Sequence, residues 1–319
     1  MKKILLVTDQ YEIQADYLVD ELKRRGADFI RFHPWDFPLQ TKISVNCSNG
    51  DIVGTVDDTN YAFNAGDIKS VWYRGLKETR LFEGFNEDEK RYASAQVRDT
   101  LRGLFSITPG LWVNDPFVQT YANLKIRQLQ VAKELGLRIP KTIISNDPKE
   151  ISAFYDKCGG SMVVFKTLAQ VIWKIGGSVF TTPVDKDFIG KHSELIRRAP
   201  CVFQEYIEKK LELRITIFGK KILTAAIYSQ EKDTARYDWR MGEDLRHEPF
   251  QLPAELEGKL LQLMEKFKIT YGAIDMILTP EGEYVFLEVN PQGMFGWLEE
   301  KTGVKYYAAL ADLLVAGKI

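Results

Sequence analysis

The chain has 319 residues, of which 45% are hydrophobic and 27% are charged, a balance that excludes a disordered or fibrous protein. Lys plus Arg number 43 and Asp plus Glu number 44, so the net charge of -1 provides no overall basic field for nucleic acid or an anionic membrane. Cys47, Cys158 and Cys201 are widely spaced without a C-x-x-C pattern, which argues against a disulfide framework and a zinc site and favours a reducing cytoplasm.

The N-terminal segment has the pattern of a β-α-β unit. Residues 4–7 predict a buried strand, because this apolar run is too short for a signal-peptide core or a membrane span. A helix over 11–25 and a second strand over 27–32 are expected to follow. The turn at 8–11 lacks the glycines that let a backbone approach a pyrophosphate. We therefore expect a scaffold or a peptide-binding wall here rather than the nucleotide site.

The next segment mixes strands and helices. Residues 71–74 predict a strand, and Asn86 with Glu89 forms a capping pattern for a helix that runs to about residue 104. A strand end and turn are expected at 112–116, and helical spacing returns over 122–135.

Beyond residue 160 the pattern changes to antiparallel hairpins. Strands are expected at 162–168, 179–182, 211–218, 221–228, 273–278 and 284–290. With a linker expected near 115–121, the chain divides into three predicted units, 1–117, 118–190 and 191–319. The first would be an α/β domain, and the other two would be subdomains built on antiparallel sheets.

Two of these predicted strands bring oxygen-bearing side chains together. Period-2 alternation places Asp275 on one face of its strand, and it places Glu288 and Asn290 on one face of the next strand. A two-residue hairpin on Glu281-Gly282 would pair position 275 with position 288. Such hard oxygens suit Mg²⁺, which shares its ligand shell with phosphates and water. Spacing alone fits equally well with polar residues on a half-exposed hairpin.

The same period-2 pattern predicts which side chains lie on the other face of the second strand. Alternation places Val285, Leu287 and Val289 there, opposite to Glu288.

Several residues upstream could contact a nucleotide. Lys166 lies in an apolar strand, where its ammonium needs an anion or a route to solvent. The segment Gln204, Glu205, Tyr206 and Ile207 either offers backbone groups to an adenine edge or is an ordinary strand end.

Three further features allow two interpretations each. Lys125 alone is typical of a helix surface, and residues 174–178 form either a glycine-rich flap over phosphates or a hairpin turn. Glu212 and Arg214 lie on the polar face of a strand whose other face is apolar, so this face is a candidate site wall. Arg214 could equally form a structural ion pair.

The order of these residues resembles the ATP-grasp ligases over about residues 110 to 300. The shared order is a helical lysine, a strand lysine, a Gln-Glu-aromatic segment, an acidic-x-Arg strand, and an Asp strand followed by Glu-x-Asn. The most specific part is Glu288-Val289-Asn290-Pro291. The resemblance implies an α/β (α+β) ATP-grasp fold with an N-terminal α/β pre-ATP-grasp domain and a nucleotide between two antiparallel-sheet subdomains.

The resemblance also implies roles for the candidate residues. Lys125 and Lys166 would contact ATP phosphates, Gln204, Glu205, Tyr206 and Ile207 would hold adenine, and Glu212 would lie at the ribose. Arg240 would steady the phosphates or an acyl phosphate, and Arg214 would hold the acceptor carboxylate. Asp275, Glu288 and Asn290 would bind Mg²⁺, with Asn290 also close to the nucleotide.

Within this superfamily the chain most resembles the microviridin-type ligases, the graspetide macrocyclases. The matching segments are Val71-Trp72-Tyr73-Arg74, Gln204 to Lys209, Leu211 to Arg214, Asp238-Trp239-Arg240, Phe286 to Gly293, and Trp297-Leu298-Glu299. Arg74-Gly75 stands where the family pattern has two basic residues or Arg-Pro.

This likeness implies a cytoplasmic ligase that phosphorylates an Asp or Glu side chain of a ribosomal precursor peptide with ATP. A Ser or Thr hydroxyl would then form an ω-ester, or a Lys amine an ω-amide, with release of ADP and phosphate. The implied partner is the leader and core of that peptide, with peptide-binding helices expected in 118–190 and a homodimer as one possible assembly. Neither nucleic acid nor membrane is expected as a partner.

Two other functions remain open. An ATP-grasp ligase could add a free amino acid to a protein or a small carboxylate. A nucleotide-binding regulator could keep the architecture without turnover, although the three metal-ligand positions argue against it.

Overall fold

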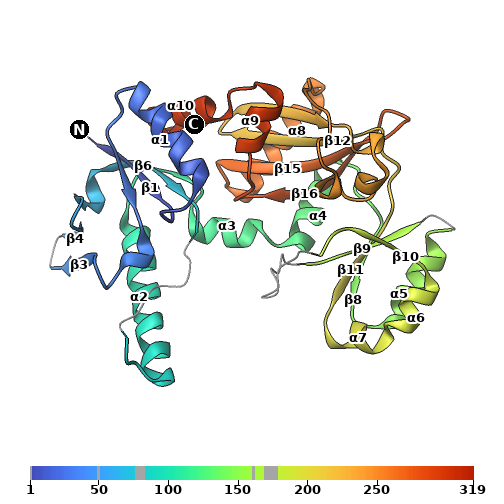
Figure 1. Cartoon of the computed structure of the whole chain (residues 1–319), viewed down its shortest axis with the longest axis horizontal. Helices are drawn as coiled ribbons and strands as arrows, with labels where there is room; N and C mark the ends of the chain where they lie inside the picture. The colour runs from blue at the N-terminus through green and yellow to red at the C-terminus, as the bar shows by residue number, and fades with distance from the viewer. Residues whose placement is uncertain (1, 49–50, 76–82, 160–161, 169–178) are drawn as a thin grey trace.

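The computed structural model describes residues 2–48, 51–75, 83–159, 162–168 and 179–319 (Figure 1). The N-terminal part is built on a parallel sheet with the strand order β2-β1-β6-β7. Its strands are β1 (Lys3–Val7), β2 (Phe29–Phe32), β6 (Ile68–Tyr73) and β7 (Leu111–Val113). Alternate residues of β1 enter two different cores, because Leu5 and Val7 pack on one side and Ile4 and Leu6 on the other. Burial on both faces explains the continuous apolar run.

Two helices and a small antiparallel sheet complete this part. The helices are α1 (Ile13–Arg24) and α2 (Glu87–Ile107), and the small sheet consists of β3 (Lys42–Cys47), β4 (Ile52–Asp57) and β5 (Ala62–Asn64). The predicted capping box is confirmed: Asn86 accepts a hydrogen bond from the Glu89 backbone, and the Glu89 carboxylate accepts one from the Asn86 backbone. The small sheet was not predicted from the sequence.

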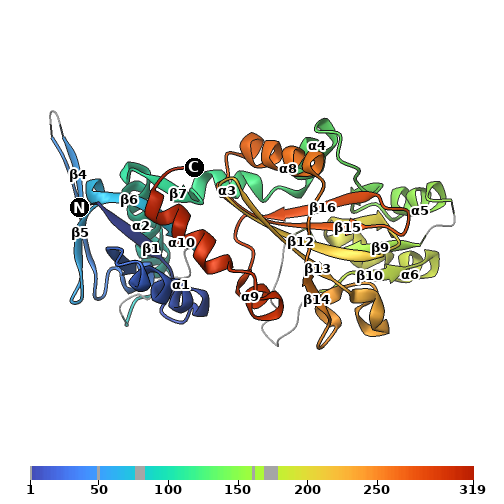
Figure 2. The same cartoon turned by 90° about the horizontal axis from the view of Figure 1, so that it is seen from above.

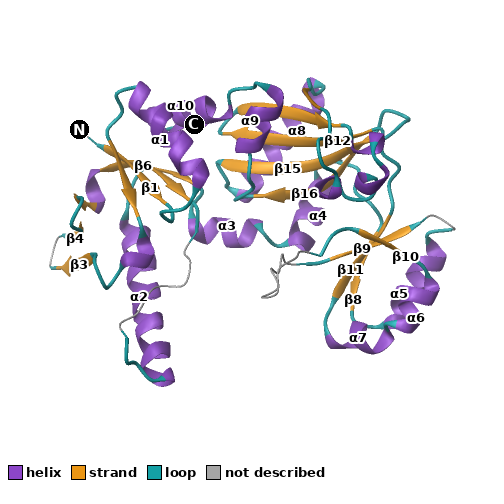
Figure 3. Cartoon of the chain, viewed as in Figure 1, coloured by secondary structure: helices purple, strands orange, loops and turns teal. Residues whose placement is uncertain are grey.

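A second sheet follows in the middle of the chain. It has the order β10-β9-β11-β8, and its strands are β8 (Thr142–Ser145), β9 (Val163–Lys166), β10 (Thr182–Val184) and β11 (Cys201–Glu205). The helices α5 (Pro148–Lys157), α6 (Lys186–Lys191) and α7 (Ser193–Arg198) cover one face of it (Figure 3). The predicted domain limits stay a prediction. We propose placing the second limit after β11 rather than at residue 190, because β11 pairs with β8 and β9.

The third sheet is antiparallel throughout, with the order β14-β13-β12-β15-β16. Its strands are β12 (Leu211–Phe218), β13 (Lys221–Ile227), β14 (His247–Pro249), β15 (Tyr271–Leu278) and β16 (Tyr284–Asn290). Helices α4 (Lys125–Glu134) and α8 (Ala254–Phe267) bury one face of the sheet in the largest apolar core. The strand predicted at 284–290 has the observed bounds.

The remaining helices join the parts. They are α3 (Pro116–Ala122), α9 (Gly296–Thr302) and α10 (Tyr306–Ala316), with short 3-10 turns at Pro34–Asp36, Ala65–Asp67, Ser229–Glu231, Asp233–Ala235 and Trp239–Met241. Seen from above, α10 lies beside α1 (Figure 2), and it shares one apolar core with β1 and the third sheet. The C-terminal helix therefore belongs structurally to both halves. Within the described residues, no helix is long and apolar enough to cross a membrane.

Asn114 holds the junction between β7 and the third sheet. It is 1% exposed, and its amide nitrogen donates to the Tyr271 oxygen at 2.7 Å and to the Pro291 oxygen at 2.8 Å. Its oxygen accepts from the backbone nitrogens of Thr270 and Tyr271, both at 2.8 Å. One side chain thus satisfies four backbone groups that are otherwise shut off from water.

We expect Asn114→Ala to lower the free energy of unfolding by about 3 to 5 kcal/mol, because it leaves several backbone groups without partners in a dry site. Urea unfolding followed by tryptophan fluorescence would measure this loss. Asn60→Ala, a change at an exposed turn, is the control and should shift the midpoint very little. An Asn114→Ala midpoint equal to that of the control would show that the junction does not depend on this side chain.

Candidate functional site

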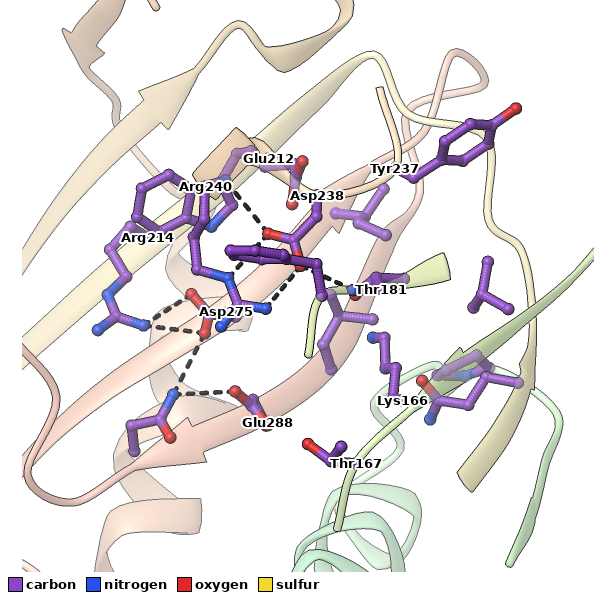
Figure 4. Close-up of a pocket in the computed structure, with 18 of the residues that line it drawn as sticks. Lys166, Thr167, Thr181, Glu212, Arg214, Tyr237, Asp238, Arg240, Asp275 and Glu288 are labelled. Atoms are coloured by element: carbon purple, nitrogen blue, oxygen red, sulfur yellow. Dashed lines mark hydrogen bonds and ion pairs between the residues drawn. The ribbon is translucent and has the colours of Figure 1, made fainter. Parts of the chain in front are cut away.

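A cavity of about 530 Å³ opens between the second and third sheets. One wall comes from β9, β11 and the segment after β11, and the other from β12, β15, β16 and the loop that follows β16 (Figure 4). Every residue of β12 is buried, yet its side chains Glu212 and Arg214 line the cavity. A strand that faces an apolar core on one side thus carries charges into the cavity on the other.

The three predicted metal-binding residues lie together at the β15–β16 end of this cavity. Asp275 pairs directly with Glu288 across the two strands, as predicted. The Asn290 amide nitrogen lies 3.3 Å from a carboxylate oxygen of Asp275 and 3.1 Å from one of Glu288. Three polar side chains therefore converge on one point.

The pairing is reached by a route that differs from the prediction. The expected two-residue hairpin is wrong: Leu278 pairs with Tyr284, so residues 279–283 form a longer connection. This shift alone would misalign the carboxylates, but a β-bulge between the pairs of Asp275 and Met276 restores the register. The bulge inserts one extra residue, Leu287, into β16.

The bulge also corrects the predicted faces of β16. Of the three residues expected opposite Glu288, only Val289 lies in the large core, where Phe286 joins it. Val285 and Leu287 instead pack with Ile277 on the cavity side of the sheet. The extra residue changes the alternation, so simple period-2 spacing fails there.

Each of the two carboxylates has its own cation. The Arg214 guanidinium donates to both oxygens of Asp275 at 2.8 and 2.9 Å, because the two residues are direct neighbours on β12 and β15. Lys125, at the start of α4, forms an ion pair with Glu288. Burial disfavours the charged form of Glu288, but Lys125, Asn290 and Lys166 together outweigh it and lower the pKa to about 2. Burial raises the pKa of Asp275, and Arg214 opposes that shift.

The donor set fits a hard cation. Two carboxylates and one amide oxygen are the kind of ligands that Mg²⁺ takes while it keeps water or phosphate oxygens. Among the described residues there is no group of three His, Cys, Asp or Glu side chains that could hold a metal alone. Asn290 directs its nitrogen toward both carboxylates, so binding through its oxygen requires rotation of the amide. The ligand roles of these three residues stay a prediction.

The segment predicted to hold adenine also lines this cavity. Gln204 donates to Thr142 at 2.9 Å, and Glu205 accepts from the Lys141 backbone at 2.9 Å, so both side chains bind β8 or its approach. Tyr206 packs its ring edge-on against Tyr237 at 5.6 Å, and Ile207 packs beside Ile277. The four residues therefore form a wall that is partly polar and partly apolar.

The ribose candidate Glu212 already has a partner in the structure. Lys209 donates to it at 2.9 Å and to the Tyr237 oxygen at 3.0 Å. Burial raises the pKa of Glu212, and Lys209 acts against that shift. Lys209 had no role assigned from the sequence. Its position three residues before Glu212 was nevertheless a local signal for an ion pair between the two.

Arg240 is fixed by Asp238, a residue of the matching segment to which no role of its own was assigned from the sequence. Asp238 accepts from its guanidinium at 2.8 and 2.6 Å and from the Thr181 backbone at 3.0 Å. Although burial opposes ionisation, these contacts lower the pKa of Asp238 to about 2. The Arg240 guanidinium lies over the Phe180 ring at 5.3 Å. Arg240 is therefore held at the cavity wall rather than free to swing.

Lys166 differs from the other cations of the cavity. Every carboxylate that lines the cavity is matched with a cation, in the pairs Glu205–Lys141, Glu212–Lys209, Asp238–Arg240, Asp275–Arg214 and Glu288–Lys125. Within the described part of the chain, Lys166 has no ion pair or hydrogen bond of its side chain. Burial lowers the pKa of its ammonium. An unmatched, half-buried cation favours an anionic ligand. The predicted glycine-rich flap at 174–178 lies outside the described residues.

Two family models match this chain. The MvdD pre-ATP grasp domain matches residues 3–119, and the RimK-like ATP-grasp domain matches residues 122–314. Among curated proteins, the probable alpha-L-glutamate ligase 2 of Shewanella amazonensis is 22% identical over 84% of this chain and 87% of its own length.

Solved structures are similar over almost the whole chain. The RiPP-associated ATP-grasp ligase of Chryseobacterium gregarium, in complex with ADP and a leader and core peptide, is 31% identical with a TM-score of 0.90, covering 99% of this chain and 97% of that one. Macrocyclase MdnC of Microcystis aeruginosa, bound with precursor peptide MdnA, is 34% identical with a TM-score of 0.87, covering 99% and 100%. The predicted fold, with its pre-ATP-grasp and ATP-grasp parts, is confirmed.

The unmatched Lys166 gives a pH-dependent prediction. Because its pKa is lowered, the ammonium loses its charge at a lower pH than an exposed lysine, and the affinity for ATP should fall as the pH rises from about 7.5 to about 10. Lys166→Arg should remove most of this fall, because a guanidinium stays charged over that range. Isothermal titration with magnesium-ATP would measure both profiles. Parallel profiles for the two proteins would contradict a phosphate role for Lys166.

Proposed function

Because this chain belongs to the RimK-like ATP-grasp family, we propose that it is an ATP-dependent macrocyclase that acts on a ribosomal precursor peptide. It joins an Asp or Glu side chain of that peptide to a Ser or Thr hydroxyl, or to a Lys amine, within the same molecule. The observation that carries this proposal is the likeness to two ligases, at 31% and 34% identity, that extends through both parts of the chain. Both of those ligases hold precursor peptides.

The chemistry explains why the site is crowded with cations. A carboxylate resists attack because its charge repels the nucleophile and its oxygen leaves poorly. Bound ATP supplies the γ-phosphoryl group, and Mg²⁺ offsets part of its charge. Once a carboxylate oxygen carries that group and ADP has formed, the hydroxyl or amine attacks the carbonyl carbon. The bond from that carbon to the phosphorylated oxygen breaks, and phosphate leaves with the oxygen, while the nucleophile loses one proton.

The chain's own residues position charge around this reaction. Lys125 and Lys166 approach the cavity from opposite walls and would hold the phosphates. Arg214 is fixed between Asp275 and the Met294 oxygen, 3.2 Å from its second terminal nitrogen. A guanidinium that is already oriented loses little freedom when it binds an acyl phosphate, so it stabilises developing charge efficiently. Arg240, fixed by Asp238, would act from the other side.

The proposed metal ligands would serve the same end of the cavity. Asp275, Glu288 and Asn290 would bind Mg²⁺ between them and the ATP phosphates, in agreement with their donor chemistry. Glu212, with Lys209, would contact the ribose, and the segment from Gln204 to Ile207 would contact the adenine.

A second ligase activity is supported by the curated relatives. The Shewanella amazonensis protein is named as a probable alpha-L-glutamate ligase, and it matches most of this chain at 22% identity. Such an enzyme would add a free amino acid to a carboxylate instead of closing a ring. We favour the macrocyclase because the more similar solved structures are peptide-bound. A cytoplasmic location, with three free cysteines in its support, and a homodimer remain proposals.

Mass spectrometry tests the proposed activity. Incubation with magnesium-ATP and a candidate precursor peptide rich in Thr, Ser, Asp and Glu should lower the peptide mass by one water per ring, with one ADP formed per ring. The peptide with its Asp and Glu residues changed to Asn and Gln is the control and should keep its mass. A gain of one amino-acid residue, in reactions that also contain free amino acids, would indicate the glutamate-ligase type of activity instead.

Glu288→Gln should reduce ring formation about 100-fold or more, because it removes a charged metal ligand while it keeps the size of the side chain. Glu283→Gln is a matched control on the same hairpin, since Glu283 pairs with Arg138 and its side chain is 57% exposed. The control should keep nearly full activity. Initial rates of ADP release, with a thermal melt of each protein, would measure the difference. Equal rates in the two variants would remove Glu288 from the metal site.

A further inference from the structure

The loop at residues 291–295 lies between a proposed metal ligand and a helix. It begins directly after Asn290, and it leads into α9, whose first residue is Gly296. Three of its residues, Gln292, Gly293 and Met294, line the cavity. The helix has no capping side chain of its own at its N-cap, Phe295. Its first backbone N–H groups therefore need acceptors from elsewhere in the chain.

Gln14, from the N-terminal part of the chain, supplies that acceptor. Its side-chain oxygen accepts from the backbone nitrogens of Phe295 and Gly296, both at 3.1 Å. Its nitrogen donates to the Met294 sulfur at 3.4 Å. Gln14 lies on α1 and is 1% exposed, although a glutamine on a surface helix is usually solvated. Its burial is thus explained by the loop it binds.

The packing around Gly296 leaves no space for a side chain at this position. A Cβ atom at Gly296 would collide with the Tyr307 hydroxyl and would lie 3.5 Å from the Gln14 side chain. The absence of a side chain therefore lets α1 and α10 approach the first turn of α9 closely. This contact fixes the backbone of the loop at its far end.

Arg74 holds the other end of the loop from the same domain. Its guanidinium donates to the Gln292 oxygen at 2.9 Å and lies over the Trp72 ring at 5.5 Å. Glu12, also on the N-terminal side, lies 3.7 Å from the guanidinium. Arg74, which belongs to a segment that carries the sequence resemblance, therefore faces the loop at 291–295.

The loop in turn fixes Arg214. The Met294 oxygen accepts from a terminal nitrogen of Arg214 at 3.2 Å. A Cβ atom at Gly293 would lie 2.7 Å from that same nitrogen, so the loop backbone passes directly against the guanidinium. A displacement of the loop would release one of the two points that hold Arg214, and only the contact with Asp275 would remain.

We propose that Gln14, with Arg74, is a positioning residue for the reaction: it holds the loop at 291–295 so that Met294 fixes the Arg214 guanidinium toward the acceptor. This inference rests on the proposed function, because Arg214 matters to catalysis only if the chain activates a carboxylate. The N-terminal part would then help to orient a side chain of the reaction site, in addition to any contact with the peptide.

The test compares Gln14→Met with three other variants. Methionine keeps the length of the side chain but removes the amide oxygen, whereas Gln14→Glu keeps an oxygen that accepts from both backbone nitrogens. Ser70→Ala is the control for loosening between the domains, because Ser70 is buried at the same interface, donates to the Leu314 oxygen at 2.7 Å, and is remote from the loop. Arg74→Met provides a second way to release the loop.

The kinetic measurement uses magnesium-ATP and the same candidate precursor peptide. Gln14→Met should lower kcat for ring formation about 10-fold or more, with the KM for ATP within about twofold of wild type. Arg74→Met should act in the same direction, and Gln14→Glu and Ser70→Ala should keep most of the turnover. Unchanged kcat in Gln14→Met, or an equal loss in Ser70→Ala, would overturn the proposal.

Hydrogen exchange provides a measurement that needs no substrate. In Gln14→Met the amides of Phe295 and Gly296 should exchange at least about 10 times faster than in the wild type, while those of β15 stay protected. Unchanged exchange at these amides would also overturn the proposal. If the wild type forms no ring but the exchange result holds, the proposed function fails while the contact between Gln14 and the loop stands.

Discussion

The structure depends on charges that are buried in matched pairs between two sheets. Arg214 and Asp275 face each other across β12 and β15, the central strands of the third sheet. Such a pair is costly to bury and is retained only when its hydrogen bonds are nearly complete. Here the neighbouring strand adds Asn290, and the loop after β16 adds the Met294 oxygen. Because the Arg214–Asp275 pair needs hydrogen-bond partners from all three elements, the sheet, the hairpin and the loop form one site.

The pairing of charges in the cavity also explains how it can attract a polyanion without a basic surface. The chain as a whole has a net charge of -1, and the carboxylates of the cavity are each matched by a cation. Within the described residues, Lys166 is the cation that remains, and its pKa is lowered because it is buried without a partner. A bound phosphate would give this ammonium a partner, in agreement with the phosphate role proposed for Lys166.

The sequence predicted which residues meet in this cavity better than it predicted how the strands bring them together. The pairing of Asp275 with Glu288 was predicted correctly through a wrong hairpin, because the longer connection and the bulge beside Glu288 offset each other. The bulge at Leu287 could not be foreseen, since its position depends on how the connection at 279–283 closes. The partners Lys209 and Asp238 lie close in the chain to the residues they bind, so local spacing carried a signal. Gln14 lies 281 residues from Phe295, and no local pattern can indicate such a contact.

The N-terminal part shows why a correct exclusion can still miss a function. The glycine-free turn after β1 excluded a dinucleotide site there, and a scaffold or a peptide-binding wall was expected in its place. A scaffold would need only apolar contacts with the third sheet, and α10 already supplies these by packing against α1. The polar contacts of Gln14 and Arg74 exceed that need, and they are directed at backbone atoms of the loop at 291–295. Buried polar groups are stable only when their hydrogen bonds are complete, so the docked N-terminal part stabilises this course of the loop together with the Tyr271 hydroxyl, which donates to the Gly293 oxygen. Because Arg214 takes its second contact from that loop, we infer that the orientation of the guanidinium depends on the docking of a domain whose described residues do not line the cavity.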